Sequence, residues 1–252
     1  MRFASLGSGS RGNALLVESG RSRILIDAGF GPREMRRRLQ RLGTDANAID
    51  ALLVTHEHTD HVGGAFACAD RFGWEVVMTA GTLGASPRGS RAAVRTIDSH
   101  EAFDLFGLHV EPFPVPHDAR EPVQFVVGDG VRRLGVVTDT GHVTPHMAAM
   151  LSACDALVLE CNHDLEMLAS GGYPPALKRR IAGPQGHLDN AAAAGLLAEV
   201  EHRNLRHVVA AHLSEQNNTP ALATAALAKA LGCSPTDIGV AGQELGTDWR
   251  DL

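Results

Sequence analysis

The chain has 252 residues, of which 44% are hydrophobic and 21% are charged, and its formal net charge is −6 at pH 7. A net negative charge argues against broad nonspecific adhesion to nucleic acid, although a local site carrying divalent cations is compatible with it. The sequence has no apolar run of about eighteen residues and no basic-then-apolar leader, so we expect no membrane span, no signal peptide and a cytoplasmic location. The lack of any linker predicts one domain over residues 1–252.

The cysteines give no sign of a disulfide framework or a zinc finger. They are far apart in the sequence and lack CxxC spacing, at Cys68, Cys154, Cys161 and Cys233. Reduced, buried thiols are therefore expected.

The first half of the sequence predicts a succession of strands with two helices inserted. A short strand at the start leads into a Gly/Ser loop at residues 7–13, which suits either phosphate binding through backbone N–H groups or a plain turn. Further strand patterns cover residues 14–18, 23–27, 51–54, 75–79, 95–97 and 109–115. A helix is predicted over residues 32–42, because Pro32 suits its first turn and Gly43 its end. A weaker helical stretch follows Gly64, and residues 81–91 indicate a loop or a short helix.

The second half repeats this pattern. Strands are predicted at residues 123–127, 133–138, 156–160 and 207–211, and helices at residues 190–201 and 220–231. Two strand-rich halves that each carry outer helices favour an α/β fold, arranged as a four-layer αββα sandwich.

Four strong metal ligands occur within six residues, directly after the predicted strand at residues 51–54: His56, His58, Asp60 and His61. On a helix His56 and His58 would point about 200° apart, so an extended or looped backbone is needed for both to reach one ion. Asp60 and His61 are then expected to face a second position. The alternative interpretation is a polar loop that happens to be rich in histidine.

Three further candidates follow predicted strands, where side chains can converge at one sheet edge. They are His117, Asp139 and His212. A lone histidine after a strand is more often structural than a ligand, but three such positions beside a dense ligand cluster favour a metal site. Asp27 ends another strand, where it either supports the metal site or caps a turn.

The HxHxDH string at residues 56–61, together with Asp139 in a TDTG sequence, resembles the metallo-β-lactamase superfamily. Within it, the wider motifs GSGSRGN, PHD, LECNHD, GHLDN and AHLSEQNNTP resemble the YycJ/WalJ-like branch, which is related to the ribonuclease Z type. This resemblance covers nearly the whole chain. It implies a four-layer metallo-β-lactamase sandwich and a 5′-to-3′ exonuclease acting on DNA.

The resemblance also implies two divalent ions, zinc or manganese, and assigns their ligands. His56, His58 and His117 would hold the first ion, Asp60, His61 and His212 the second, and Asp139 would bridge them. Ions about 3.5 to 4 Å apart can share a hydroxide, which is a nucleophile at neutral pH, and can offset charge on a phosphorane-like transition state. A histidine-rich ligand set favours zinc, whereas the two aspartates leave manganese open.

His187 is implied as a catalytic residue by the same resemblance. In the ribonuclease Z branch a histidine at the start of a helix lies near the scissile phosphate beside an acidic partner, and His187 with Glu160 match that pair. We expect His187 to donate a proton or a hydrogen bond, with Glu160 fixing its tautomer; the alternative is a structural histidine. His163 and Asp164 are expected to act as supporting contacts or turn caps. Serine is usual in this branch where Cys161 and Asp189 stand, and Asp189 would add negative charge near the phosphate.

Basic groups are candidates for phosphate contacts if the substrate is a nucleic acid. One set forms a face of the helix over residues 32–42 and is either solvated or tracks a phosphate backbone: Arg33, Arg36, Arg37, Arg38 and Arg41. A second set, expected to act with the N-terminal loop, comprises Lys178, Arg179 and Arg180.

Other functions share this fold and ion pair, so the fold does not select the substrate. A glyoxalase II-like thioesterase would need a helical substrate domain, which is not evident in the sequence. A cyclic-phosphate phosphodiesterase would need extra cysteine or histidine ligands for a structural zinc. A non-catalytic, metal-binding regulator would show a damaged ligand set, whereas all seven positions are filled here. The sequence therefore favours a metal-dependent phosphodiesterase with a nucleic acid substrate and no membrane partner.

Overall fold

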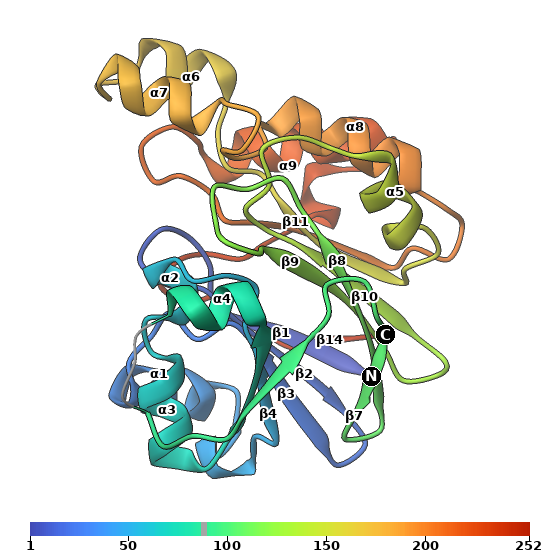
Figure 1. The fold of residues 1–252 in the computed structure, drawn as a ribbon. Coiled ribbons are helices and arrows are strands. Elements are labelled where there is room, and N and C mark those ends of the chain that lie inside the picture. Colours follow the sequence, from blue (N-terminus) through green and yellow to red (C-terminus); the bar gives the residue numbers. More distant parts are fainter. Residues whose placement is uncertain (87–89) are drawn as a thin grey trace.

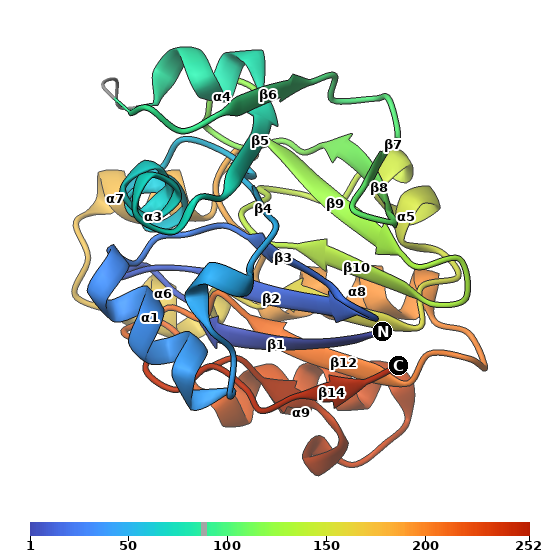
Figure 2. The ribbon, with the colours of Figure 1, turned by 90° about the horizontal axis from the view of Figure 1, so that it is seen from below.

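A computed structural model of the protein describes residues 1–86 and 90–252. Two seven-stranded β-sheets face each other, and helices cover both outer faces of the pair (Figure 1; Figure 2). The predicted four-layer αββα sandwich is therefore confirmed.

The first sheet is built from the N-terminal strands and one strand from the C-terminus. Its order is β14-β1-β2-β3-β4-β5-β6, and the pairs from β3 to β6 are parallel. The strands are β1 (Arg2–Gly7), β2 (Ala14–Ser19), β3 (Ser22–Ile26), β4 (Ala51–Leu53), β5 (Glu75–Thr79), β6 (Val94–Ile97) and β14 (Arg250–Asp251). The helices of this half are α1 (Pro32–Arg41), α2 (Thr59–Val62), α3 (Ala65–Phe72) and α4 (Ala80–Ala85), with a short 3-10 helix η1 (Ala46–Ala48).

The second sheet has the order β13-β12-β11-β10-β9-β8-β7, and its pairs from β10 to β13 are parallel. Its strands are β7 (Phe103–Leu105), β8 (Leu108–Pro114), β9 (Val123–Gly128), β10 (Arg133–Val137), β11 (Ala156–Glu160), β12 (His207–Ala211) and β13 (Gly239–Val240). The helices of this half are α5 (Pro145–Leu151), α6 (Leu165–Ser170), α7 (Pro175–Ile181), α8 (Asn190–Val200) and α9 (Pro220–Leu231), with a 3-10 helix η2 (Pro235–Asp237).

Three apolar clusters separate the layers. One lies between the sheets, and the other two lie between each sheet and its helices. The side chains of strand β9 alternate between two of these clusters. Val123, Phe125 and Val127 face the opposite sheet, whereas Val126 faces the helices. The strand is therefore buried on both faces.

Replacing Phe125 by alanine is expected to lower the free energy of unfolding by about 3 to 5 kcal/mol, because the ring is fully buried between the sheets. Denaturant unfolding measures the change. The matched change Val131→Ala, at a side chain that is 79% exposed, should cost no more than about 0.5 kcal/mol. Similar costs for both would contradict this description of the core.

Several short elements were not predicted from the sequence: β7, β13, β14, α5, α6 and α7. Helix α7 has no buried residue, so it lacks the core-facing apolar pattern by which helices are predicted. Helix α2 begins inside the HxHxDH string, earlier than the expected helical stretch. The loop or short helix expected over residues 81–91 contains most of α4, and its residues 87–89 lie outside the described residues.

All four cysteines are free, as expected, but the prediction that they are buried is wrong for Cys233, which is exposed. Within the described ranges, no helix combines the length and apolar character needed to cross a bilayer.

Candidate metal centre

The seven predicted ligands meet at one end of the sandwich, beyond the ends of four strands. His56, His58, Asp60 and His61 follow β4 in the first sheet, and the remaining three, His117, Asp139 and His212, follow β8, β10 and β12 in the second. The structure thus brings together side chains from both sheets.

His56, His58 and His117 offer ring nitrogens that all lie within 4.8 Å of one another. Nδ1 of His117 donates to the Gly186 carbonyl over 3.0 Å, which leaves its Nε2 at 3.2 Å from Nδ1 of His58. Nε2 of His56 is buried and has no hydrogen-bond partner within the described part of the chain. A buried lone pair that faces two other imidazole nitrogens suits a bound cation.

A chain of hydrogen bonds fixes the tautomer of His56. The hydroxyl of Thr55 donates to Asp27, whose Oδ2 lies at 2.9 Å, so its oxygen accepts from Nδ1 of His56, also at 2.9 Å. Asp27 also lies 2.7 Å from Nδ1 of His61. One carboxylate therefore orients two of the candidate ligands, which settles the role that the sequence left open for Asp27.

A second group comprises Asp60, His61 and His212, whose ligand atoms also lie within 4.8 Å of one another. Nδ1 of His212 lies 3.2 Å from Glu160 Oε1, and its Nε2 lies 3.3 Å from Asp60 Oδ2. His61 and His212 thus each have Nδ1 held by a carboxylate, that of Asp27 or of Glu160, and Nε2 turned into the centre.

Asp139 lies between the two groups. It forms a third set of closely spaced ligand atoms with His56 of the first group and His61 of the second. Its side chain is buried, with Oδ2 at 3.0 Å from Nε2 of His61. This position is suited to a carboxylate that bridges two cations.

Three residues at the centre have left-handed backbone conformations. The φ angles of Asp27, Asp139 and His212 are 64°, 55° and 54°, which is uncommon for residues other than glycine and costs about 1 kcal/mol or more each. Asp27 and His212 directly follow β3 and β12, and one residue separates Asp139 from the end of β10. In each case the turn directs the side chain toward the shared edge. Sequence patterns do not reveal such backbone angles.

The Gly/Ser loop supports the centre from the side. The Ser8 hydroxyl accepts from the backbone N–H of His212 over 2.8 Å and donates to Oδ1 of Asn13 over 3.0 Å. Nδ2 of Asn13 in turn lies 3.1 Å from Nε2 of His61. Asn13 and Thr55 are supporting residues that the sequence reasoning did not assign. The signal for Thr55 was its position beside the HxHxDH string, and the signal for Asn13 was its place in the GSGSRGN motif.

Electrostatics divide the histidines into two kinds. Burial lowers the pKa of His56 and of His117, which favours neutral rings. Burial would lower the pKa of His212 as well, but the surrounding carboxylates, led by Asp139, outweigh it and raise that pKa to about 10. Nearby carboxylates, led by Asp139, likewise outweigh burial and raise the pKa of His61. Burial would raise the pKa of Asp139, but the neighbouring histidines lower it.

Metal binding is expected to release protons, because a ligating nitrogen must be unprotonated while His61 and His212 hold protons in the metal-free protein. The apparent affinity should therefore rise with pH through the neutral range, toward the raised pKa of about 10 for His212. Titration calorimetry at one pH in two buffers of different ionisation enthalpy measures the protons released. Identical heats in the two buffers would contradict the expectation.

His187 and Glu160 form the predicted pair. Nδ1 of His187 lies 2.8 Å from Glu160 Oε1, and Glu160 Oε2 accepts from the backbone N–H groups of Thr140 and Leu188. Burial would raise the pKa of Glu160, but His187 in particular lowers it to about 2, so Glu160 is a carboxylate. Nε2 of His187 is then free to face the cavity. His187 and Glu160 also form, with Asp139 and His212, a group able to hold a cation. The geometry of His187 therefore suits either a catalytic residue or a metal ligand.

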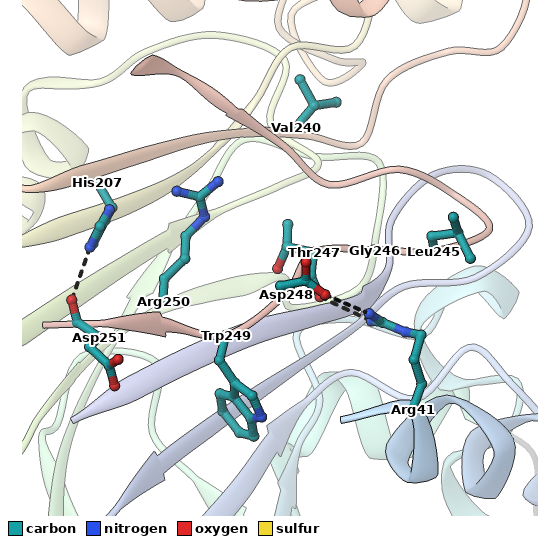
Figure 3. A pocket seen from close by; sticks show the side chains of 10 residues that line it. All are labelled: Arg41, His207, Val240, Leu245, Gly246, Thr247, Asp248, Trp249, Arg250 and Asp251. Atoms are coloured by element: carbon teal, nitrogen blue, oxygen red, sulfur yellow. Dashed lines mark hydrogen bonds and ion pairs between the residues drawn. The ribbon is translucent and has the colours of Figure 1, made fainter. Parts of the chain in front are cut away.

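A cavity of about 380 Å³ opens over the centre. It is lined by Asp60, Asp139, His187 and His212, by the polar residues Ser10, Thr59, Asn162 and Ser214, and by Tyr173, Leu177, Arg180 and Ile181 from the α7 region. A separate cavity of about 860 Å³ lies near β14, where Arg41 pairs with Asp248 and His207 bonds to the Asp251 carbonyl (Figure 3). None of the seven candidate ligands lines this second cavity.

Several predicted contacts have other roles. Asp189 accepts from the N–H groups of Ala191 and Ala192 and caps α8, and Asp164 caps α6 in the same way. The expectation that Asp189 adds charge beside a phosphate is thus not supported. His163 is buried but does not line the cavity, and Cys161 packs in the apolar cluster around α8.

Some of the α1 arginines make contacts within the fold, and none of them lines the cavity over the centre. Arg38 is buried, donates to the carbonyls of Leu6 and Gln243, and lies over the Phe30 ring. Arg37 pairs with Glu34. Arg38 is therefore unavailable to a phosphate backbone, whereas the other arginines of this helix are exposed, and a phosphate-tracking role for them stays a prediction.

The fold and the ligand cluster define a metal-dependent hydrolase. A model of the β-lactamase superfamily domain matches residues 22–213, and the chain belongs to this superfamily. The exodeoxyribonuclease YycJ of Bacillus anthracis is 33% identical to it, over 98% of this chain and 96% of that protein. The exodeoxyribonuclease WalJ of Streptococcus pneumoniae is 29% identical, over 95% of this chain and 91% of that protein. Among solved structures, the metallo-β-lactamase fold protein YhfI from Bacillus subtilis has a TM-score of 0.77 and 12% identity, with 99% of this chain and 98% of that chain covered, which shows a shared fold.

Proposed function

We propose that this protein is a metal-dependent phosphodiesterase that degrades DNA as a 5′-to-3′ exonuclease. The observation that carries the proposal is the centre itself, where two sets of ligand atoms are joined through Asp139. The two full-length relatives named exodeoxyribonucleases support DNA as the substrate.

The residues fit two divalent ions. His56, His58 and His117 would hold one, Asp60, His61 and His212 the other, and Asp139 both, with Nε2 of His56 as a buried atom that lacks a hydrogen-bond partner among the described residues. Zinc suits the five imidazoles, and the two carboxylates also accept manganese. When bound, the ions would supply a hydroxide nucleophile and offset charge on a phosphodiester.

The protein's own groups would orient the substrate and manage its protons. Glu160 holds Nδ1 of His187, which places the opposite ring nitrogen toward the cavity. Burial opposes a charged imidazole, but Glu160 outweighs it and raises the pKa of His187, so the ring is able to carry a proton at neutral pH. We propose that His187 donates this proton, or a hydrogen bond, to the leaving oxygen of the phosphodiester. Asp60 would take part directly, since its carboxylate lines the cavity as well as the second ligand set.

In the decisive experiment, metal is removed from the protein with a chelator, zinc or manganese is added back, and turnover of several substrates is measured. These are 5′-labelled single-stranded and double-stranded DNA, RNA, a cyclic nucleotide and a thioester. DNA shortened from its 5′ end is the expected result, and turnover of the thioester without cleavage of DNA would overturn the proposal. Binding of metal without turnover of any substrate would favour a regulator instead.

A further inference from the structure

Helices α6 and α7 form a hairpin that projects at one end of the molecule (Figure 1). The hairpin is fixed at both ends next to the metal centre. The backbone N–H of Asp164 donates to the Asn217 carbonyl over 2.8 Å, and that of His187 donates to the Ile181 carbonyl over 2.9 Å. At Gly186 an added Cβ would lie 2.1 Å from the Ile181 oxygen, so the end of α7 packs directly on the residue before His187.

An apolar stripe on this hairpin faces the cavity instead of the core. Tyr173, Leu177 and Ile181 are spaced four residues apart, and all three line the cavity. Leu177 and Ile181, at this spacing, share one face of α7, and Tyr173 lies just before the helix begins. Because α7 has no buried residue, the stripe has no role in the apolar core. An apolar face that is unused by the core and turned into the candidate active site points to a substrate contact.

The backbone of Tyr173 is restricted by the proline that follows it. It precedes Pro174 and Pro175, and a residue before proline is restricted to extended backbone conformations. Its ring is half-buried in the cavity wall. A tyrosine side chain also has few rotatable torsions, so it loses little conformational freedom when a flat ligand stacks on its ring.

The cavity also has polar lining residues. Ser10, Asn162 and Ser214 line it beside the candidate ligands. Arg180 lies next to the apolar stripe, and its Nε donates to Asp118 over 2.7 Å, which points this side of the guanidinium toward the centre. The cavity therefore combines apolar and aromatic lining residues with charged and hydroxyl groups, which matches a nucleotide.

We propose that the ring of Tyr173, extended by Leu177, stacks on a nucleobase next to the scissile phosphate, with Arg180 near the adjoining phosphate. This inference rests on the proposed nuclease function and makes it more specific. The substrate is a nucleic acid strand whose base lies against α7, and Tyr173 is a positioning residue for that base.

The test compares Tyr173→Ala and Tyr173→Phe on a 5′-labelled single-stranded oligonucleotide and on methyl p-nitrophenyl phosphate, which has no base. The alanine variant should lower kcat/KM for the oligonucleotide about 5- to 150-fold, the range expected for loss of one aromatic stacking contact. The effect should lie mainly in KM, the phenylalanine variant should behave as wild type, and neither should differ on the small ester. Leu165→Ala is the matched control, because Leu165 is a 55% exposed apolar residue of the same hairpin that does not line the cavity.

Two further measurements separate this proposal from the proposed function. An oligonucleotide with abasic sites at its 5′ end should be cleaved equally by wild type and the alanine variant. Fluorescence anisotropy of the labelled oligonucleotide with metal-free protein should give a Kd that rises by a similar factor in the alanine variant. Wild-type cleavage of DNA with no change in the alanine variant would overturn the role of Tyr173. Failure of the wild type to cleave DNA would overturn the proposed function, and the anisotropy measurement would still decide whether Tyr173 binds a base.

Discussion

Replacing Asp139 by asparagine is expected to lower kcat for DNA cleavage by about 10³-fold or more and to remove at least part of the bound metal. Asp139 shares close ligand sets with both His56 and His61, so its carboxylate would neutralise charge at both positions. Loss of a bridging carboxylate removes several kcal/mol of electrostatic stabilisation, and each 1.36 kcal/mol is a factor of ten in rate. Asparagine is a suitable replacement, because it has a similar size and tolerates the left-handed φ of 55° at this position.

Turnover of DNA and metal content by elemental analysis measure the result. The control is Asp104→Asn, which breaks another aspartate–histidine contact, with His109 at 2.9 Å, on the exposed hairpin of β7 and β8. That variant should keep full activity and metal. An Asp139→Asn protein that retains wild-type turnover would show that the bridging assignment is wrong.

Replacing His187 by alanine is expected to lower turnover by about 10²- to 10⁴-fold, the range for loss of a general acid, while metal content stays near that of wild type. The reason is its position: Nδ1 is engaged by Glu160, and the ring lines the cavity over the centre. The variant Glu160→Gln should also lose activity, because an amide group cannot fix the imidazole as a carboxylate does, but its effect on His212 makes some loss of metal expected too.

His109→Ala is the control for this change, since His109 is an exposed histidine on β8 and lies away from the cavity. Equal losses of metal and turnover in His187→Ala would make His187 a ligand, which the geometry of its group with Asp139 and His212 also allows. Rates measured with a substrate that has a good leaving group sharpen the result. Such a substrate needs no proton on the leaving oxygen, so the variant should recover activity toward it.

The position of the metal centre could be predicted from the sequence because its ligands follow regular patterns. The HxHxDH string ends a buried strand, and His117, Asp139 and His212 each come after a strand that alternation or apolar character identifies. Strand ends of a sandwich meet at its edges, so convergence follows from topology alone. The pairing of His187 with Glu160 came from resemblance to a related branch, and the structure places the two side chains 2.8 Å apart.

Other features could not be predicted, for physical reasons. The backbone angles of Asp139 and His212 arise from turns that depend on contacts between the two halves, such as the hydrogen bond from the His212 N–H to Ser8. Helix α7 lacks a buried face, so no core-facing apolar periodicity identifies it as a helix in the sequence. The capping role of Asp189 could not be predicted because its side-chain direction was unknown: the carboxylate turns back to cap α8.

The placement of ligands on two sheets has a mechanical consequence. In the proposed arrangement each ion would join a residue after β4 in the first sheet to a residue after β8 or β12 in the second. Each ion would therefore connect the two sheets at this end of the sandwich. Because such ions would bind the folded chain in preference to the unfolded one, they would hold the two sheets together at the edge where the reaction would take place.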